Sequence, residues 1–79
     1  MTADQCRAAR GLLHLRADAL AARAGVSLTT LRNFECSARQ PLKLTVRALR
    51  AELEAAGALF VDADAEAGPG VRLQAQAAG

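Results

Sequence analysis

Residues 17–36 leave few choices for the fold, because their pattern predicts two short helices joined by a tight turn. Gly25 stands where the first of these helices would end, and glycine tolerates the left-handed backbone that follows many helices. Ala21 stands where the two helices would cross, and its small side chain allows them to pack at a wide angle. We therefore expect helices at about 17–24 and 28–36. The apolar residues expected to pack between the two helices are Leu20, Val26, Leu31 and Phe34.

Two further helices are expected on either side of this pair. Thr2 and Gln5 have the three-residue spacing of a capping box, which predicts a helix over about 3–13. Another helix is expected over about 44–56, with Gly57 as its C-cap. The side chains expected to face the core from this last helix are Leu44, Ala48, Leu49, Leu53 and Ala56.

The last part of the chain predicts a β-hairpin. Short apolar runs indicate strands at about 59–61 and 71–73, joined by an acidic loop that ends in Gly-Pro-Gly. Two strands are too few for a stable isolated sheet, so they must pack on the preceding helix or pair across a two-fold axis with a second copy. The chain then divides into a helical domain at 1–57, a hairpin at 58–74 and a flexible tail at 75–79. The hairpin residues expected to join two copies, alone or with the preceding helix, are Leu59, Phe60, Val61, Val71 and Leu73.

The charge of the chain is unevenly distributed. Residues 1–50 hold nine Lys and Arg against three Asp and Glu, a net charge of +6, whereas residues 51–79 hold one Arg against five acidic residues, a net charge of −4. This asymmetry suggests a polyanion as the partner of the basic part, although solvated helix charges would give the same count. The chain has two Phe and no Trp or Tyr, which counts against single-stranded nucleic acid, because such sites stack bases on aromatic rings.

The sequence offers no chemistry for an enzyme, a metal site or another cofactor. It holds no nucleophile–base pair, phosphate-binding loop or pair of carboxylates at a suggestive spacing. Cys6 and Cys36 lack metal-ligand spacing, and His14 is the single histidine. We interpret both cysteines as small core residues rather than a redox switch, and His14 as a capping or surface residue. Without a signal peptide or an apolar run long enough for a membrane, a reduced cytoplasmic protein is expected.

The residues from Ala17 to Glu35 resemble the helix-turn-helix of the Cro/repressor-type (XRE) family. The resemblance extends over about 4–57, includes the spacing from Glu35 to Pro41, and continues in a hairpin similar to the tail of a subgroup of short bacterial regulators. It implies a mainly α fold, with a four-helix lambda-repressor-like domain followed by a C-terminal β-hairpin. It also implies a homodimeric transcriptional repressor, associated with the nucleoid, that binds a palindromic operator in double-stranded DNA through the 28–36 helix.

The same resemblance assigns roles to single residues at the start of that helix. Asn33 would pair with adenine, Arg32 would reach guanine or a phosphate, and Thr29 would bond a base. Leu28 would be exposed and pack on a thymine methyl, because other leucine and phenylalanine side chains fill the inner face; the alternative is that it packs back on the domain. Contacts with phosphates are implied for Arg16, Ser27, Thr30, Arg39, Gln40 and Lys43.

Two further expectations come from the family. Arg10 would lie beside Glu35 as a partly buried ion pair that locks the DNA-reading helix. Many relatives have Ser and Gln where this chain has Arg16 and Ala17, so the N-cap of the second helix is expected to be lost and Arg16 to supply a phosphate contact. The alternative function is a protein-interaction module, which would bind RNA polymerase, act on a second regulator as an anti-activator, or serve as an antitoxin. The polar residues expected on the third helix favour DNA, and they leave repressor and activator undecided.

Overall fold

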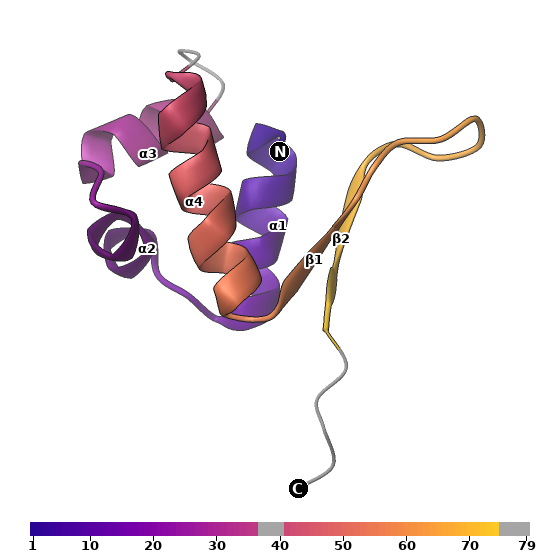
Figure 1. Cartoon of the computed structure of the whole chain (residues 1–79), viewed down its shortest axis with the longest axis horizontal. Coiled ribbons are helices and arrows are strands. Elements are labelled where there is room, and N and C mark those ends of the chain that lie inside the picture. Colours follow the sequence, from indigo (N-terminus) through magenta and orange to yellow (C-terminus); the bar gives the residue numbers. More distant parts are fainter. Residues whose placement is uncertain (37–40, 75–79) are drawn as a thin grey trace, which may run out of the picture.

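The computed structural model describes residues 1–36 and 41–74, which form four helices followed by a two-stranded antiparallel sheet (Figure 1). This mainly helical chain with a C-terminal hairpin is the coarse architecture that the sequence predicts. The expectation of a flexible tail at 75–79 falls outside the described residues. The elements in chain order are α1 (Ala3–Leu13), α2 (Ala17–Ala24), α3 (Leu28–Glu35), α4 (Lys43–Ala55), β1 (Ala58–Val61) and β2 (Gly70–Leu73).

Single residues explain where α1 and α2 begin and end. α1 begins with the predicted capping box, in which the Thr2 hydroxyl accepts from the Gln5 backbone N–H at 3.0 Å and the Gln5 side chain accepts from the Thr2 N–H at 2.9 Å. α1 ends at His14, a cap in the left-handed conformation with a φ of 53°. Gly25 ends α2 with a φ of 71°, a conformation that glycine adopts at no steric cost. Arg16 precedes α2 without a side-chain cap, as the sequence predicts.

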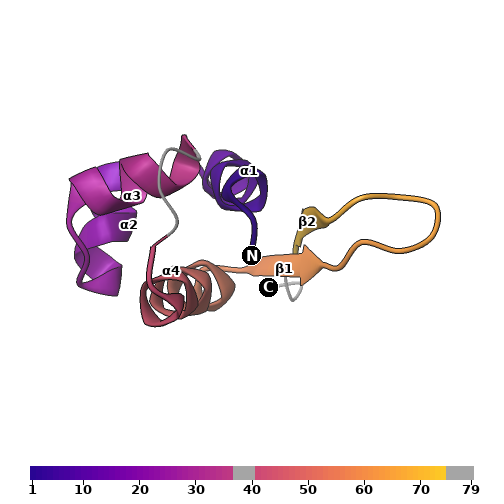
Figure 2. The same cartoon turned by 90° about the horizontal axis from the view of Figure 1, so that it is seen from above.

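The core lies among the four helices and is closed on one side by the hairpin. Leu20 of α2, Leu31 of α3 and Leu49 of α4 have no exposed surface, and they form one cluster with buried residues of α1. Figures 1 and 2 show α1 and α4 between the α2–α3 pair on one side and the hairpin on the other. The hairpin therefore lies across the helical body from α2 and α3.

The hairpin has one face on the core and one face in solvent. Phe60 pairs with Val71, and both pack against the core, whereas Leu59 pairs with Arg72 on the opposite face. The guanidinium of Arg50 in α4 lies 5.0 Å from the centre of the Phe60 ring, which adds a cation–π contact to the packing. Figure 2 shows that the loop joining the strands projects away from the helices.

The bounds of α3 and α4 differ by one residue from the prediction. α3 ends at Glu35 with Cys36 as its C-cap, whereas the sequence predicts a helix that includes residue 36. α4 begins at Lys43 and ends before Ala56, which replaces Gly57 as the C-cap. Gly57 instead takes a φ of 116° at the turn into β1, where the chain reverses direction.

The inward face of α4 also differs from the prediction. Leu44, predicted to face the core, is 74% exposed, and Ala56 is exposed as well. The buried stripe runs through Leu49 and Leu53, and the half-buried Val46 continues it one turn earlier. A residue five positions before Leu49 points about 140° away from that stripe, so it cannot face the same core.

Candidate nucleic-acid interface

Helix α3 has an exposed polar face. Thr29, Arg32 and Asn33 are exposed, whereas Leu31 and Phe34 of the same helix are buried. Within the described residues, the side chains of the three exposed residues make no hydrogen bond or ion pair. Three of the four residues predicted to read bases are therefore available to an external partner.

Helices α2 and α3 are joined by a short turn, and their axes are steeply inclined to each other. Figure 1 shows α2 nearly end-on while α3 lies across the view, and Figure 2 shows the same inclination from above. Ala21 is 3% exposed, and its carbonyl accepts from the Val26 N–H at 3.0 Å to close the turn. The Ser27 hydroxyl accepts from the Thr30 N–H at 3.0 Å and so caps α3. These contacts fix where α3 starts.

Leu28, the first residue of α3, is half-buried rather than exposed as the sequence suggests. It lines a pocket of about 320 Å³ where α2 and α3 begin, with Ala17 of α2 as the other apolar residue. Leu28 therefore shares this pocket with the first turn of α2, which helical periodicity within α3 does not reveal. The charged residues that line the same pocket are Arg10, Arg16, Asp18 and Arg32.

The residues predicted to contact phosphates differ in their surroundings. Arg16 and Lys43 are exposed, and Arg16 lies 3.2 Å from the carboxylate of Asp18. The hydroxyls of Ser27 and Thr30 bond each other at 2.8 Å, so each already has a partner. Outside the described residues lie Arg39 and Gln40.

An ion pair ties α1 to the end of α3. Arg10 Nε donates to Glu35 Oε2 at 2.7 Å and Arg10 Nη2 donates to Glu35 Oε1 at 2.6 Å, a two-point contact typical of arginine with a carboxylate. The Glu35 side chain is 6% exposed and that of Arg10 is 21% exposed. The hydrogen bond with Glu35 raises the pKa of Arg10 above its ordinary value. The structure thus brings together the two residues that the family resemblance pairs.

Two further groups, whose contacts the sequence does not reveal, bind Glu35. The Cys6 thiol donates to Glu35 Oε2 at 3.2 Å, and the Arg7 guanidinium donates to the Glu35 backbone carbonyl. Burial, followed by the hydrogen bond with Glu35, raises the pKa of the Cys6 thiol to about 12. Cys6 is the core residue that the sequence predicts, but Cys36 is exposed, because it caps α3 beyond the last buried turn.

Gln5 has a second role that the sequence does not reveal. Its side chain is buried, and Nε2 donates to the carbonyls of Val61 at 3.2 Å and Gly70 at 2.9 Å. Val61 and Gly70 are paired across the hairpin. The capping box locates Gln5 at the start of α1, but its acceptors come from residues far along the chain. Gln5 therefore ties the N-terminus of α1 to the hairpin.

The five hairpin residues predicted to join two copies divide between the two faces of the sheet. Phe60 and Val71 are half-buried against the core of their own chain. Leu59 is 46% exposed and Val61 is 42% exposed, and both lie on the outer face. Leu73 is 47% exposed at the base of the hairpin, opposite Ala58 in the ladder.

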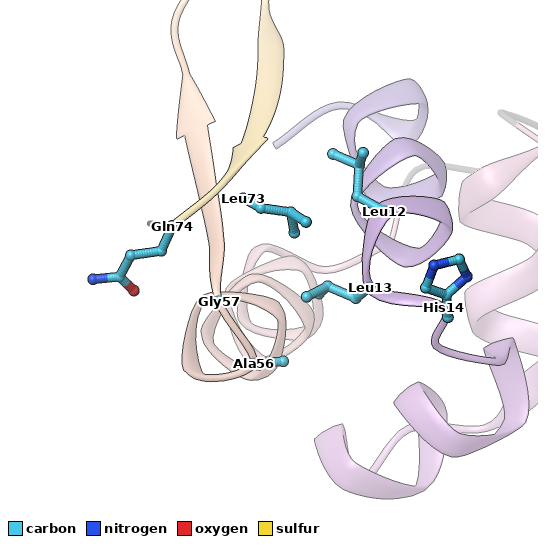
Figure 3. Close-up of a pocket in the computed structure, with 7 residues that line it drawn as sticks. All are labelled: Leu12, Leu13, His14, Ala56, Gly57, Leu73 and Gln74. Atoms are coloured by element: carbon cyan, nitrogen blue, oxygen red, sulfur yellow. The ribbon is translucent and has the colours of Figure 1, made fainter. Parts of the chain in front are cut away.

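A larger pocket of about 710 Å³ opens at that base, between the hairpin and the ends of α1 and α4 (Figure 3). In Figure 3, Leu13 of α1 and Leu73 of β2 extend into the space between the two elements, whereas Gln74 points away. The Gln74 N–H donates to the Gly57 carbonyl at 2.7 Å and closes the base of the hairpin. This pocket is separate from the exposed face of α3.

Within residues 1–36 and 41–74, no three His, Cys, Asp or Glu side chains are grouped so as to hold a metal ion. None of the helices in this described part of the chain is long and apolar enough to cross a membrane. The chain matches no protein-family model, and no curated protein is significantly similar to it.

Proposed function

We propose that this chain is a homodimeric transcriptional regulator of the helix-turn-helix class, similar to XRE-family repressors, that binds double-stranded DNA sequence-specifically. α2 and α3 would form the helix-turn-helix, and α3 would enter the major groove. The observation that carries the proposal is the exposed polar face of α3, formed by Thr29, Arg32 and Asn33, whose side chains have no partner among residues 1–36 and 41–74. Amide, hydroxyl and guanidinium groups on a rigid helix match the donors and acceptors of base edges.

The distribution of charge supports the same proposal. The basic residues are concentrated at 1–50, the part that contains α2 and α3. The acidic residues Asp62, Asp64 and Glu66 lie in the hairpin loop, across the helical body from α2 and α3 (Figures 1 and 2). A DNA duplex would therefore reach α3 without approaching the acidic loop, and the basic side would attract its phosphates.

Homodimerisation through the hairpin is the second part of the proposal. Leu59 and Val61 expose apolar side chains on the outer face of a sheet that has, in the described part of the chain, two strands and open edges. Pairing of two hairpins about a two-fold axis would cover these side chains and add to a small core. It would also present two α3 helices to successive major grooves, about 34 Å apart.

Selection from a random library of double-stranded DNA tests this function. We expect the full chain to enrich a palindromic sequence whose half-sites lie about one helical turn apart. The enriched sequence would serve as the operator in binding measurements. Failure to enrich any sequence at low ionic strength, where phosphate contacts are strongest, would overturn the proposal and favour a protein-interaction module.

A further inference from the structure

A pocket with an apolar floor opens between the end of α3, the start of α4 and Met1, at one end of the helical body (Figure 1). Its volume of about 560 Å³ is typical of a site for a small molecule. Phe34 belongs to the buried core, and Met1 and Val46 pack against that core, so these three side chains form the floor. Leu42, which also lines the pocket, is 77% exposed and could cover a molecule bound there.

Two cations line the same pocket, and among the described residues no carboxylate does. Lys43 and Arg47 are four positions apart on α4, so their exposed side chains share one face of the helix. Within residues 1–36 and 41–74, neither forms an ion pair. Both lie near the N-terminus of α4, where the helix dipole makes a positive charge unfavourable and a negative charge favourable. The pocket is therefore complementary to an anion.

The floor and the cations together define the chemistry of the ligand. A phosphate of DNA would pair with Lys43 but would leave the apolar floor in contact with water. An uncharged apolar molecule would cover the floor and leave the two cations without a partner. The pocket at the base of the hairpin differs in this respect, because no Lys or Arg in the described part of the chain lines it. A molecule that uses every feature of the α3–α4 pocket has an apolar part and one anionic group.

We infer that this pocket binds a small carboxylic acid with an apolar tail, and that the bound acid is an effector that weakens DNA binding. The tail would lie on the floor, and the two carboxylate oxygens would face Lys43 and Arg47, since a guanidinium matches the geometry of a carboxylate. The effector role rests on the proposed function. Lys43 is predicted to contact a DNA phosphate, so an acid held by Lys43 would compete with DNA for it.

Titration of the full, isotope-labelled chain with octanoate, followed by NMR, tests the site without DNA. We expect saturable changes in the signals of the Val46 methyl groups and the Phe34 ring. Hexanoate should bind about fifteenfold more weakly, because two fewer methylene groups are buried. 1-Octanol, which has a tail of the same length without the charge, should also bind more weakly than octanoate. Equal binding of 1-octanol, or changes centred on Leu13 and Leu73 at the base of the hairpin, would overturn the site.

Variants of the two cations assign the carboxylate to its place. Lys43→Met and Arg47→Met remove the charge and keep an apolar side chain, and each should lower the affinity for octanoate about threefold to fivefold, the effect of one exposed ion pair. Arg23→Met is the matched control, because it removes an exposed charge of α2 that does not line the pocket, and it should leave the affinity unchanged. Melting curves establish that each variant is folded. Unchanged affinity in both Lys43→Met and Arg47→Met would contradict the assignment.

Addition of octanoate to the complex with the selected operator tests the effector role. We expect saturating octanoate to lower the affinity for DNA about tenfold, the effect of losing one charged hydrogen bond, whereas acetate at the same concentration should have little effect. Octanoate that binds the pocket and leaves the affinity for the operator unchanged would refute the effector role. Failure to select any operator would refute the proposed function, and the titration without DNA would still decide whether the pocket binds the acid.

Discussion

Arg10 of α1 holds both carboxylate oxygens of Glu35 at the end of α3, at 2.7 and 2.6 Å. The Glu35 carboxylate is 6% exposed, so its charge depends on this partner and on the Cys6 thiol for the hydrogen bonds that water would otherwise make. The contact joins the first helix to the helix that we propose reads DNA. It therefore stabilises the orientation of α3 as well as the fold.

Removal of one partner from this pair should be costly, because the other charge is left without compensation. We expect Glu35→Ala to lower the free energy of unfolding by about 3 kcal/mol, measured by urea denaturation. Glu54→Ala is the matched control, since Glu54 lies 3.3 Å from Arg50 with 48% of its side chain exposed; its loss should cost less than about 0.5 kcal/mol. Equal losses of unfolding free energy in the two variants would show that the Arg10–Glu35 pair stabilises the fold no more than an exposed ion pair does.

The features that the sequence predicts correctly depend on residues close together in the chain. Gly25 ends α2 because of its own backbone preference, and the Thr2–Gln5 capping box spans three positions. Local chemistry decides such features, so they are visible before any packing is known. The alternation of buried and exposed residues in α3 is visible for the same reason.

The features that the sequence does not predict depend on neighbours far along the chain. Leu28 is half-buried and lines a pocket with the first turn of α2, and Leu44 is exposed because the core meets a different stripe of α4. Gln5 finds its acceptors in the hairpin, at Val61 and Gly70. A single sequence shows which residues share a face of a helix. It does not show which other element packs against that face, so these contacts are known only from the structure.

Gln5 should control how firmly the hairpin is attached to α1. In Gln5→Ala, the carbonyls of Val61 and Gly70 lose their donor, and we expect a loss of about 1–3 kcal/mol of stability with faster amide exchange in β1 and β2. Hydrogen exchange measured by mass spectrometry resolves this effect. Thr2→Ala is the control, because it removes the cap of α1 and leaves the Gln5 amide in place. Unchanged exchange of the hairpin in Gln5→Ala would contradict this role.

The two cysteines should differ sharply in reactivity. Cys36 is exposed, whereas Cys6 has no exposed surface and a thiol pKa of about 12, so its thiolate is scarce at pH 8. We expect iodoacetamide to add one group to the folded chain and two to the chain in urea, counted by intact mass. Cys36→Ser should take up none while folded. Two adducts on the folded chain would contradict the burial of Cys6.

The raised pKa of Cys6 also predicts a dependence of stability on pH. Because the folded state favours the neutral Cys6 thiol, the free energy of unfolding should fall as the pH rises above 9.0.

A charge on the outer face of the hairpin should separate the proposed dimer. Leu59→Glu places a carboxylate where we expect apolar contact between copies, and sedimentation velocity should show a monomer in place of a dimer. Ala65→Glu adds the same charge in the exposed loop and should leave the dimer intact. A dimer that persists in Leu59→Glu would place the interface elsewhere, and a monomeric unmodified chain would refute this part of the proposal.

The claim that α3 reads DNA is tested most directly by measuring binding of the protein to the selected operator. Fluorescence anisotropy would give the affinity at salt concentrations between about 50 and 200 mM. The unmodified chain should bind with a steep negative dependence on salt. Arg32→Ala and Asn33→Ala should each bind about tenfold to a hundredfold more weakly, with unchanged melting temperatures, because both side chains are exposed on α3. Arg23→Ala, which removes an equal charge from an exposed residue outside every predicted contact, should have a small effect. Operator binding by Arg32→Ala and Asn33→Ala equal to that of the unmodified chain would contradict the assignment of α3 as the DNA-reading helix.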